Sequence, residues 1–63
     1  MYFTLYKDNR AEWRWKCRSS NHEDICVGSK EYAFKQGALH GIALFKQGAT
    51  AARIYDDATK TWS

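Results

Sequence analysis

The chain has 63 residues, of which 44% are hydrophobic and 16% are aromatic, with ten Lys and Arg against seven Asp and Glu. This length allows one domain, and the aromatic content excludes a disordered tail, because disordered chains are poor in these residues. No apolar run reaches the ~18–20 residues of a membrane-spanning helix. The net charge of +3 permits contact with an acidic surface without establishing it.

The first half of the chain predicts strands. Residues 2–7 are mostly aromatic or β-branched and alternate between two faces, with Phe3 and Leu5 on the same one. Residues 8–11 supply turn formers. Residues 12–19 then alternate more sharply between an apolar and a basic face. The apolar face of this second strand carries Trp13, Trp15 and Cys17, and the basic face carries Arg14, Lys16 and Arg18.

A third strand is predicted over residues 24–29. A two-residue turn at Asn21 and His22 would connect it to the second strand, and the type I′ form requires positive φ at both positions. The register that follows from this turn pairs Ser20 with Glu23, Ser19 with Asp24, and Cys17 with Cys26.

The second half of the chain predicts a helix over residues 34–47, which ends at Gly48. Gly37 and Gly41 lie one turn apart, which predicts the close approach of another backbone. A short strand over residues 53–55 and a turn over residues 56–60 follow. We expect the apolar strand face, Phe3, Leu5, Trp13, Trp15 and Cys17, to pack against Phe34, Ala38, Ile42 and Phe45 of the helix.

Several short motifs, taken in order and spacing, resemble the YegP-like family, a bacterial family of unknown function. The motifs are Tyr6-Lys7-Asp8, Glu12-Trp13-Arg14-Trp15-Lys16, Asn21, Tyr32, Lys35, Ala38, Gly41-Ile42 and Lys46. The resemblance implies an α+β fold, a β-β-β-α-β unit that occurs as a tandem pair or as two subunits with a common sheet and exchanged C-terminal strands. The family often has Gly where this chain has Ala11 and His22, so the chain departs from the family pattern at both turns.

A partner subunit is also expected from size, because a chain this short buries only about 60% of its unfolded surface. The chain looks like the single-copy form of the family: one YegP-like domain over residues 1–63, with a core over 1–49 and an exchange segment over 50–63. We therefore expect a homodimer, in which part of the exchange segment adds to the partner's sheet. The residues expected in this strand are Ala52, Arg53, Ile54 and Tyr55.

Catalytic, metal and cofactor sites are not predicted. The first residues show no secretory leader, so a cytoplasmic location is expected, where Cys17 and Cys26 would remain reduced thiols. A zinc site formed by the two cysteines with His22 and His40 conflicts with the hairpin geometry, which places His22 about 13 Å along the strand from Cys26. The resemblance brings no catalytic residues.

The basic strand face is the best lead to a ligand. Basic rows with aromatic neighbours can hold a phosphate backbone while bases stack, and the residues expected here are Lys7, Arg10, Arg14, Lys16 and Arg18. A solvated or dimer-covered face is the alternative. The leading hypothesis is therefore a non-enzymatic protein-interaction module, with sequence-independent nucleic-acid binding and a small antagonist from a mobile element as alternatives.

Overall fold

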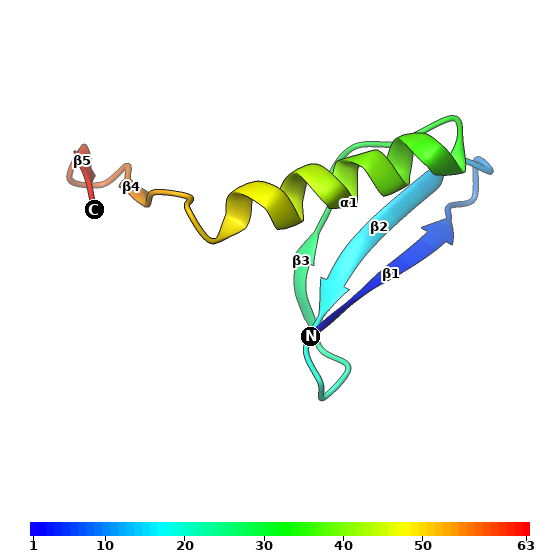
Figure 1. Cartoon of the computed structure of the whole chain (residues 1–63), viewed down its shortest axis with the longest axis horizontal. Coiled ribbons are helices and arrows are strands. Elements are labelled where there is room, and N and C mark those ends of the chain that lie inside the picture. The colour runs from blue at the N-terminus through cyan, green and yellow to red at the C-terminus, as the bar shows by residue number, and fades with distance from the viewer.

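The computed structural model describes residues 1–63 and confirms the α+β class and the three antiparallel strands followed by one helix (Figure 1). A separate two-stranded sheet comes last in the chain. The helix is too short and too polar to cross a membrane. The elements are β1 (Tyr2–Lys7), β2 (Trp13–Arg18), β3 (Asp24–Val27), α1 (Lys35–Ala49), β4 (Tyr55–Asp56) and β5 (Thr61–Trp62).

The β1–β2 loop is a three-residue connection that ends in a left-handed residue. Asp8 N–H donates to the Glu12 carbonyl at 2.9 Å, and Ala11 N–H donates to the Asp8 carbonyl at 3.0 Å, with Ala11 at φ 61°. The Asp8 carboxylate also accepts from the N–H groups of Arg10 and Glu12. This is a type I turn followed by a left-handed position, a common hairpin loop.

The β2–β3 loop repeats this design, so the predicted two-residue turn at Asn21 and His22 is wrong. Ser19 N–H donates to the Glu23 carbonyl at 2.9 Å, His22 N–H donates to the Ser19 carbonyl at 3.0 Å, and only His22 has positive φ, 65°. The Ser19 hydroxyl accepts from the N–H groups of Asn21 and Glu23, which stabilises the longer loop.

The register confirms the pairing of Cys17 with Cys26 and corrects the pairing of Ser19 with Asp24. The partner of Asp24 is Arg18, because the register shifts by one residue after Cys17 and leaves Ile25 as a bulge. A bulge twists and interrupts an edge strand, so the free edge of β3 is short and irregular. The free edge of β1 has six regularly paired residues behind it.

The core lies between α1 and the face of the sheet that carries Trp15 and Cys17 (Figure 1). Phe3, Trp15 and Phe45 meet with ring centroids 5.5–5.8 Å apart, and Cys17 and Ala38 are fully buried. This confirms the predicted contacts of Phe3, Trp15 and Phe45 and the predicted burial of Cys17 and Ala38. The prediction for Phe34 is wrong: it precedes the helix in an extended conformation, and 75% of its surface is exposed.

Gly37 and Gly41 accommodate a side chain rather than the backbone that was predicted. Tyr32 pairs with Trp13 through two backbone hydrogen bonds of 2.7 and 2.9 Å, and its ring then lies against the helix. A Cβ at Gly37 would stand 3.3 Å from Tyr32 Cδ2, and a Cβ at Gly41 would overlap the Tyr32 hydroxyl. The two glycines therefore provide the space for Tyr32 between α1 and β2.

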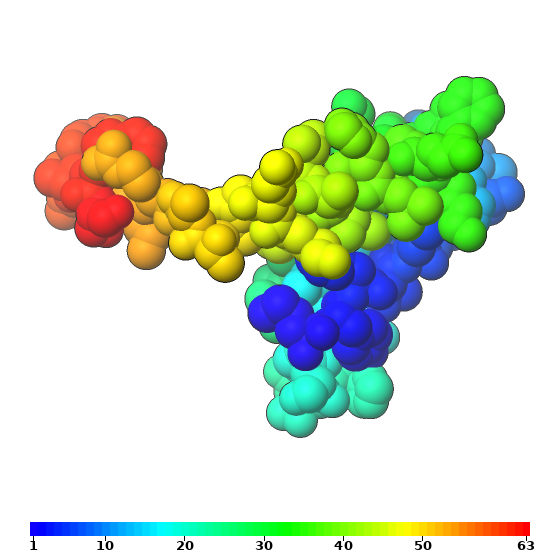
Figure 2. Space-filling model, viewed as in Figure 1, coloured from blue at the N-terminus to red at the C-terminus, as the bar shows by residue number.

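Residues 50–63, which we call the arm, project from the end of α1 away from the sheet (Figures 1 and 2). The arm is a hairpin in which Tyr55 pairs with Trp62 and Asp56 with Thr61. Ile54 and Ser63 exchange backbone hydrogen bonds of 3.2 and 2.8 Å. The strand predicted over residues 53–55 is thus displaced toward Tyr55–Asp56, because its hydrogen-bonding partner is β5.

The molecule is extended and exposes more surface than a compact chain of its mass. Its radius of gyration is 13.8 Å, against about 11 Å for a compact domain of this length. Its accessible surface is 5092 Å², against about 4200 Å² for a folded monomer of this mass. Both differences come from the arm and from a core of three buried residues, Trp15, Cys17 and Ala38.

Candidate functional site

The predicted basic row lies on the face of the sheet opposite α1. Arg14, Lys16 and Arg18 alternate along β2 with the residues that face the helix, and they stand opposite Tyr6, Thr4 and Tyr2 of β1. Their side chains are between a quarter and a third exposed. The three cations therefore form a partly exposed row on the surface, and the net charge of this row determines what it can bind.

Every cation of the row has an acidic partner. Arg14 Nε is 2.9 Å from Asp8 Oδ2, and Arg14 Nη2 is 2.8 Å from Glu31 Oε1. Arg18 Nε is 2.9 Å and Lys16 Nζ is 3.8 Å from the same Asp24 oxygen. Three cations thus face three carboxylates, and the row carries little net charge of its own.

The pair of Asp8 and Arg14 remains ionised across the physiological range. The hydrogen bond from the Arg14 guanidinium holds the pKa of the Asp8 carboxyl below its ordinary value, and the backbone N–H of Glu12 acts in the same direction. Asp8 in turn raises the pKa of Arg14. The two side chains also line an open depression with Tyr6, Asn9, Arg10 and Glu31.

Lys7 does not join the row, and Arg10 lies beyond it in the β1–β2 loop. Lys7 pairs with Trp13 and shares the helix-side face with Phe3 and Leu5. Its Nζ lies 5.2 Å from the centroid of the Trp13 ring. The alternation of residues 2–7 already contained this information, because odd-numbered residues of that strand face the core.

A second group of cations surrounds Trp13 and Tyr32, and only one of its members, Lys7, was expected from the sequence, as part of the basic row. We call this group, Lys7, Lys30 and Lys35, the lysine cluster. Lys35 Nζ lies 5.8 Å from the Trp13 ring, and Lys30 Nζ lies 5.3 Å from the Tyr32 ring. The three lysines come from a strand end, a loop and the first turn of α1, so no periodic signal in the sequence connects them. The sequence offers two hints, the alternation that puts Lys7 on the helix-side face and the nearness of Lys30 and Lys35 to Tyr32 along the chain.

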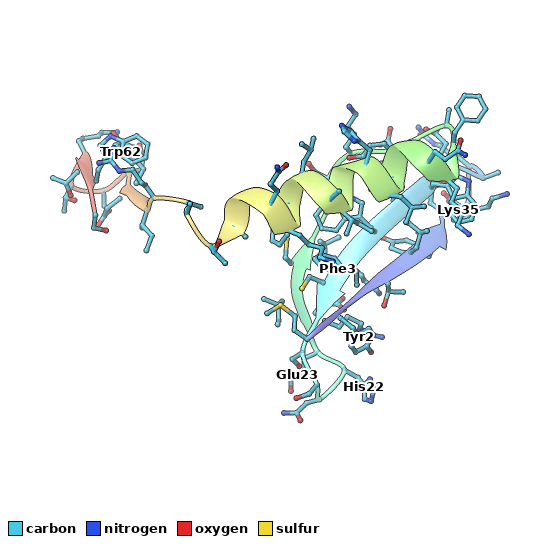
Figure 3. The ribbon with its side chains drawn as sticks, in the orientation of Figure 1. Tyr2, Phe3, His22, Glu23, Lys35 and Trp62 are labelled. Carbon is cyan, nitrogen blue, oxygen red and sulfur yellow. The ribbon has the colours of Figure 1, made fainter.

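The two cysteines lie opposite each other, and the two histidines are remote from them. Cys17 is buried beneath α1, and Cys26 is half-buried opposite it, both as free thiols. His22 Nδ1 lies 2.7 Å from the Tyr2 hydroxyl at the tip of the hairpin, where both side chains are labelled in Figure 3. His40 is exposed on α1. No three potential metal-ligating side chains come together.

The residues expected to form the exchange strand all lie in the arm and are exposed. Arg53 lies over the Trp62 ring at 4.7 Å, and the rings of Tyr55 and Trp62 are 4.9 Å apart. Ile54 is 68% exposed and Trp62 is 57% exposed. Ala52 precedes the hairpin. The arm thus presents apolar side chains that only the arm itself partly covers.

Comparison with known proteins places the chain beside small proteins without an assigned role. A family model described as a domain of unknown function, DUF1508, matches residues 8–56. A UPF0339 protein of Neisseria meningitidis serogroup B is 39% identical over 54 residues, which cover 86% of this chain and 95% of that protein. A UPF0339 protein of Agrobacterium fabrum is 34% identical over 59 residues, 94% of each chain. The family match extends past α1 into the first strand of the arm.

Proposed function

Because this chain belongs to the DUF1508 family, the YegP-like small bacterial proteins of unknown function, we propose its function from its own surface: it is a non-enzymatic protein-interaction module that works as a homodimer. In this dimer the arm of each subunit docks on the other. Residues 1–49 form the core of the domain, and residues 50–63 form the exchange segment. Ala52, Arg53, Ile54 and Tyr55 provide the first contacts with the partner.

The observation that carries this proposal is the position of the arm. A terminal segment that completed its own domain would pack on its own sheet or helix, yet the arm stands clear of both (Figure 1). It presents Ile54, Tyr55 and Trp62 to solvent at 43–68% exposure. Each Å² of this apolar surface that a partner covers contributes roughly 25 cal/mol, and the entropy cost of association is subtracted from the sum. The surface of the arm is therefore suited to docking.

The edge of β1 is the best acceptor for a strand from another subunit. β1 has a hydrogen-bonded neighbour on one side only, and its six residues are in regular register with β2. Addition of a strand to such an edge gains affinity from main-chain hydrogen bonds, and the alternate side chains of the added strand provide specificity. The β3 edge is four residues long and is bulged at Ile25, which opposes strand addition there.

The test is the mass of the protein in solution with and without the arm. Light scattering at tens of micromolar is expected to give about twice 7.3 kDa for the full chain. Removal of everything after Gly48 should give a monomer or an unfolded chain. A wild-type monomer, or a truncated chain that remains an equally stable dimer, contradicts the proposal.

The basic row is not part of this proposal as a nucleic-acid site, and the reason is its charge. Each of Arg14, Lys16 and Arg18 is within salt-bridge distance of a carboxylate, and binding of a phosphate would have to displace that partner. We assign the row to the structure of the sheet. The pair of Asp8 and Arg14 ties the β1–β2 loop to β2, and Arg18 ties β2 to β3 at the bulge.

A further inference from the structure

The positive charge of this protein is distributed unevenly among its cations. Four of the ten Lys and Arg side chains form ion pairs: Arg14, Lys16, Arg18 and Lys60. The other six have no carboxylate within salt-bridge distance. Half of these six are the lysine cluster, which gathers around one cross-strand pair of aromatic residues, Trp13 and Tyr32. The unpaired charge is thus concentrated at one end of the sheet.

The lysine cluster lies at the end of the molecule opposite the arm. Lys35 opens α1, whereas Trp62 belongs to the arm beyond the other end of that helix, as the labels in Figure 3 show. The first turn of α1 contains no acidic residue, and no side chain caps it. The positive end of the helix dipole therefore adds to the potential of the three lysines rather than being neutralised.

The chemistry of the lysine cluster fits a phosphodiester chain. A lysine held over an exposed aromatic ring gains only about 0.5–1 kcal/mol from that contact, so its ammonium group is available to a stronger anion. Trp13 is partly exposed, and the ammonium groups of Lys7 and Lys35 lie over its ring. A phosphate that draws these weakly held groups aside would free the ring face, and aromatic rings next to cations are where single-stranded bases stack. We propose that the lysine cluster binds the phosphates of single-stranded nucleic acid, with Trp13 as the stacking side chain.

This site differs from the basic row and does not require the dimer. It lies on the face of the sheet that carries Trp13 and Trp15, at the start of α1, whereas the row lies on the opposite face. It also leaves the arm free, since Lys35 and the arm are at opposite ends of α1 (Figure 3). A homodimer would carry two such sites, and a monomer would carry one.

The experiment measures fluorescence anisotropy of a labelled oligothymidylate as the full chain is added at several salt concentrations. The variant Lys7→Gln/Lys35→Gln is expected to weaken binding roughly tenfold at low salt and to lower the salt slope by about 1.4, since each phosphate contact on a single strand contributes about 0.7. The matched control Lys46→Gln/Lys60→Gln removes the same charge elsewhere and should change affinity less than about twofold. Circular dichroism checks that both variants fold.

Three results would overturn the proposal. The first is no binding of the oligothymidylate by the wild-type chain at low salt. The second is an equal loss in Lys7→Gln/Lys35→Gln and in Lys46→Gln/Lys60→Gln, or a larger loss in Lys16→Gln/Arg18→Gln, which would move the contact to the basic row. The third is polyglutamate that competes as well as oligothymidylate, which would make an acidic polypeptide the ligand.

Discussion

Ala11 adopts a backbone conformation that suits glycine. Its φ of 61° places it in the left-handed region, where the Cβ of an L-residue crowds the following carbonyl. The hydrogen bonds of Asp8 hold the loop in this shape, because the Asp8 carboxylate and backbone together engage three N–H groups of the loop. These hydrogen bonds therefore hold Ala11 in the left-handed region, and the conformational strain falls on this single residue.

The substitution Ala11→Gly is expected to stabilise the fold. Removal of the Cβ relieves roughly 1–2 kcal/mol of left-handed strain, and the greater freedom of glycine in the unfolded chain offsets part of this, which leaves a gain of about 0.5–1 kcal/mol. Urea unfolding followed by tryptophan fluorescence measures the difference. Asn9→Gly in the same loop is the control, since Asn9 has ordinary φ and should lose stability. A destabilised Ala11→Gly would contradict the strain argument.

At the scale of the element, α1 is shaped to fit one aromatic ring. Gly37 and Gly41 face Tyr32, which β2 holds in place through the backbone pair with Trp13. A glycine inside a helix lowers its stability by up to about 1 kcal/mol relative to alanine, so two of them on one face need a packing reason. The Tyr32 ring provides it. The Trp15 indole N–H, which is buried without a partner, lies in the same region.

We expect Gly41→Ala to destabilise the fold by about 1–3 kcal/mol, because the new Cβ would overlap the Tyr32 hydroxyl and force the ring to move. Thermal unfolding measures the change. Gly48→Ala is the control in the same helix: nothing lies within 4 Å of its new Cβ, so the protein should be unchanged or slightly more stable. If Tyr32→Phe restores part of the stability lost in Gly41→Ala, the hydroxyl is the source of the clash.

The predictability of this fold differs between its elements for identifiable physical reasons. Alternation over residues 12–19 predicted the two faces of β2 correctly, because a period of two is imposed by the backbone itself. The loop at residues 19–23 was predicted with the wrong length, since two-residue and three-residue turns share Asn and a left-handed residue. Phe34 has helical spacing but precedes the helix, and spacing alone does not fix where a helix begins.

The lysine cluster could be predicted only in part. The alternation of β1 puts Lys7 on the helix-side face, so its position beside Trp13 could have been predicted from the sequence. Lys30 and Lys35 reach the same place through an irregular segment, and the return of Tyr32 to the edge of β2 has no local pattern. The neutralisation of the basic row likewise depends on Asp8, Asp24 and Glu31, whose positions are set by the loops and by the segment before Tyr32.

At the scale of the whole molecule, the small core and the projecting arm both lead us to expect a partner subunit. Three of 63 residues are buried, and large apolar side chains are exposed on the arm, on α1, on β3 and just before α1. A chain with so small a core is marginally stable alone, because conformational entropy opposes folding over its full length. Association through the arm would supply the missing burial, so we expect folding and dimer formation to be coupled.

Coupling predicts a thermal midpoint that rises with protein concentration, because a dimer that unfolds to two monomers is stabilised by mass action. The substitution Ile54→Lys should lower the midpoint and weaken the dimer by roughly 2–3 kcal/mol, since it places a charge in the expected contact. Ala58→Lys, at the exposed tip of the arm, is the control and should behave as wild type. Calorimetry at several concentrations tests both. A midpoint independent of concentration contradicts the coupling.

The arm begins where α1 ends, with only residues 50–54 between the helix and its first strand. So short a connection keeps the hairpin near the end of α1, which limits the ways in which subunits can join. If two subunits each dock their arm on the other, the assembly closes as a dimer. If the arms follow one another in a single sense, the same contact propagates into a filament. The conformation of residues 50–54 therefore determines whether the assembly closes as a dimer or grows into a filament.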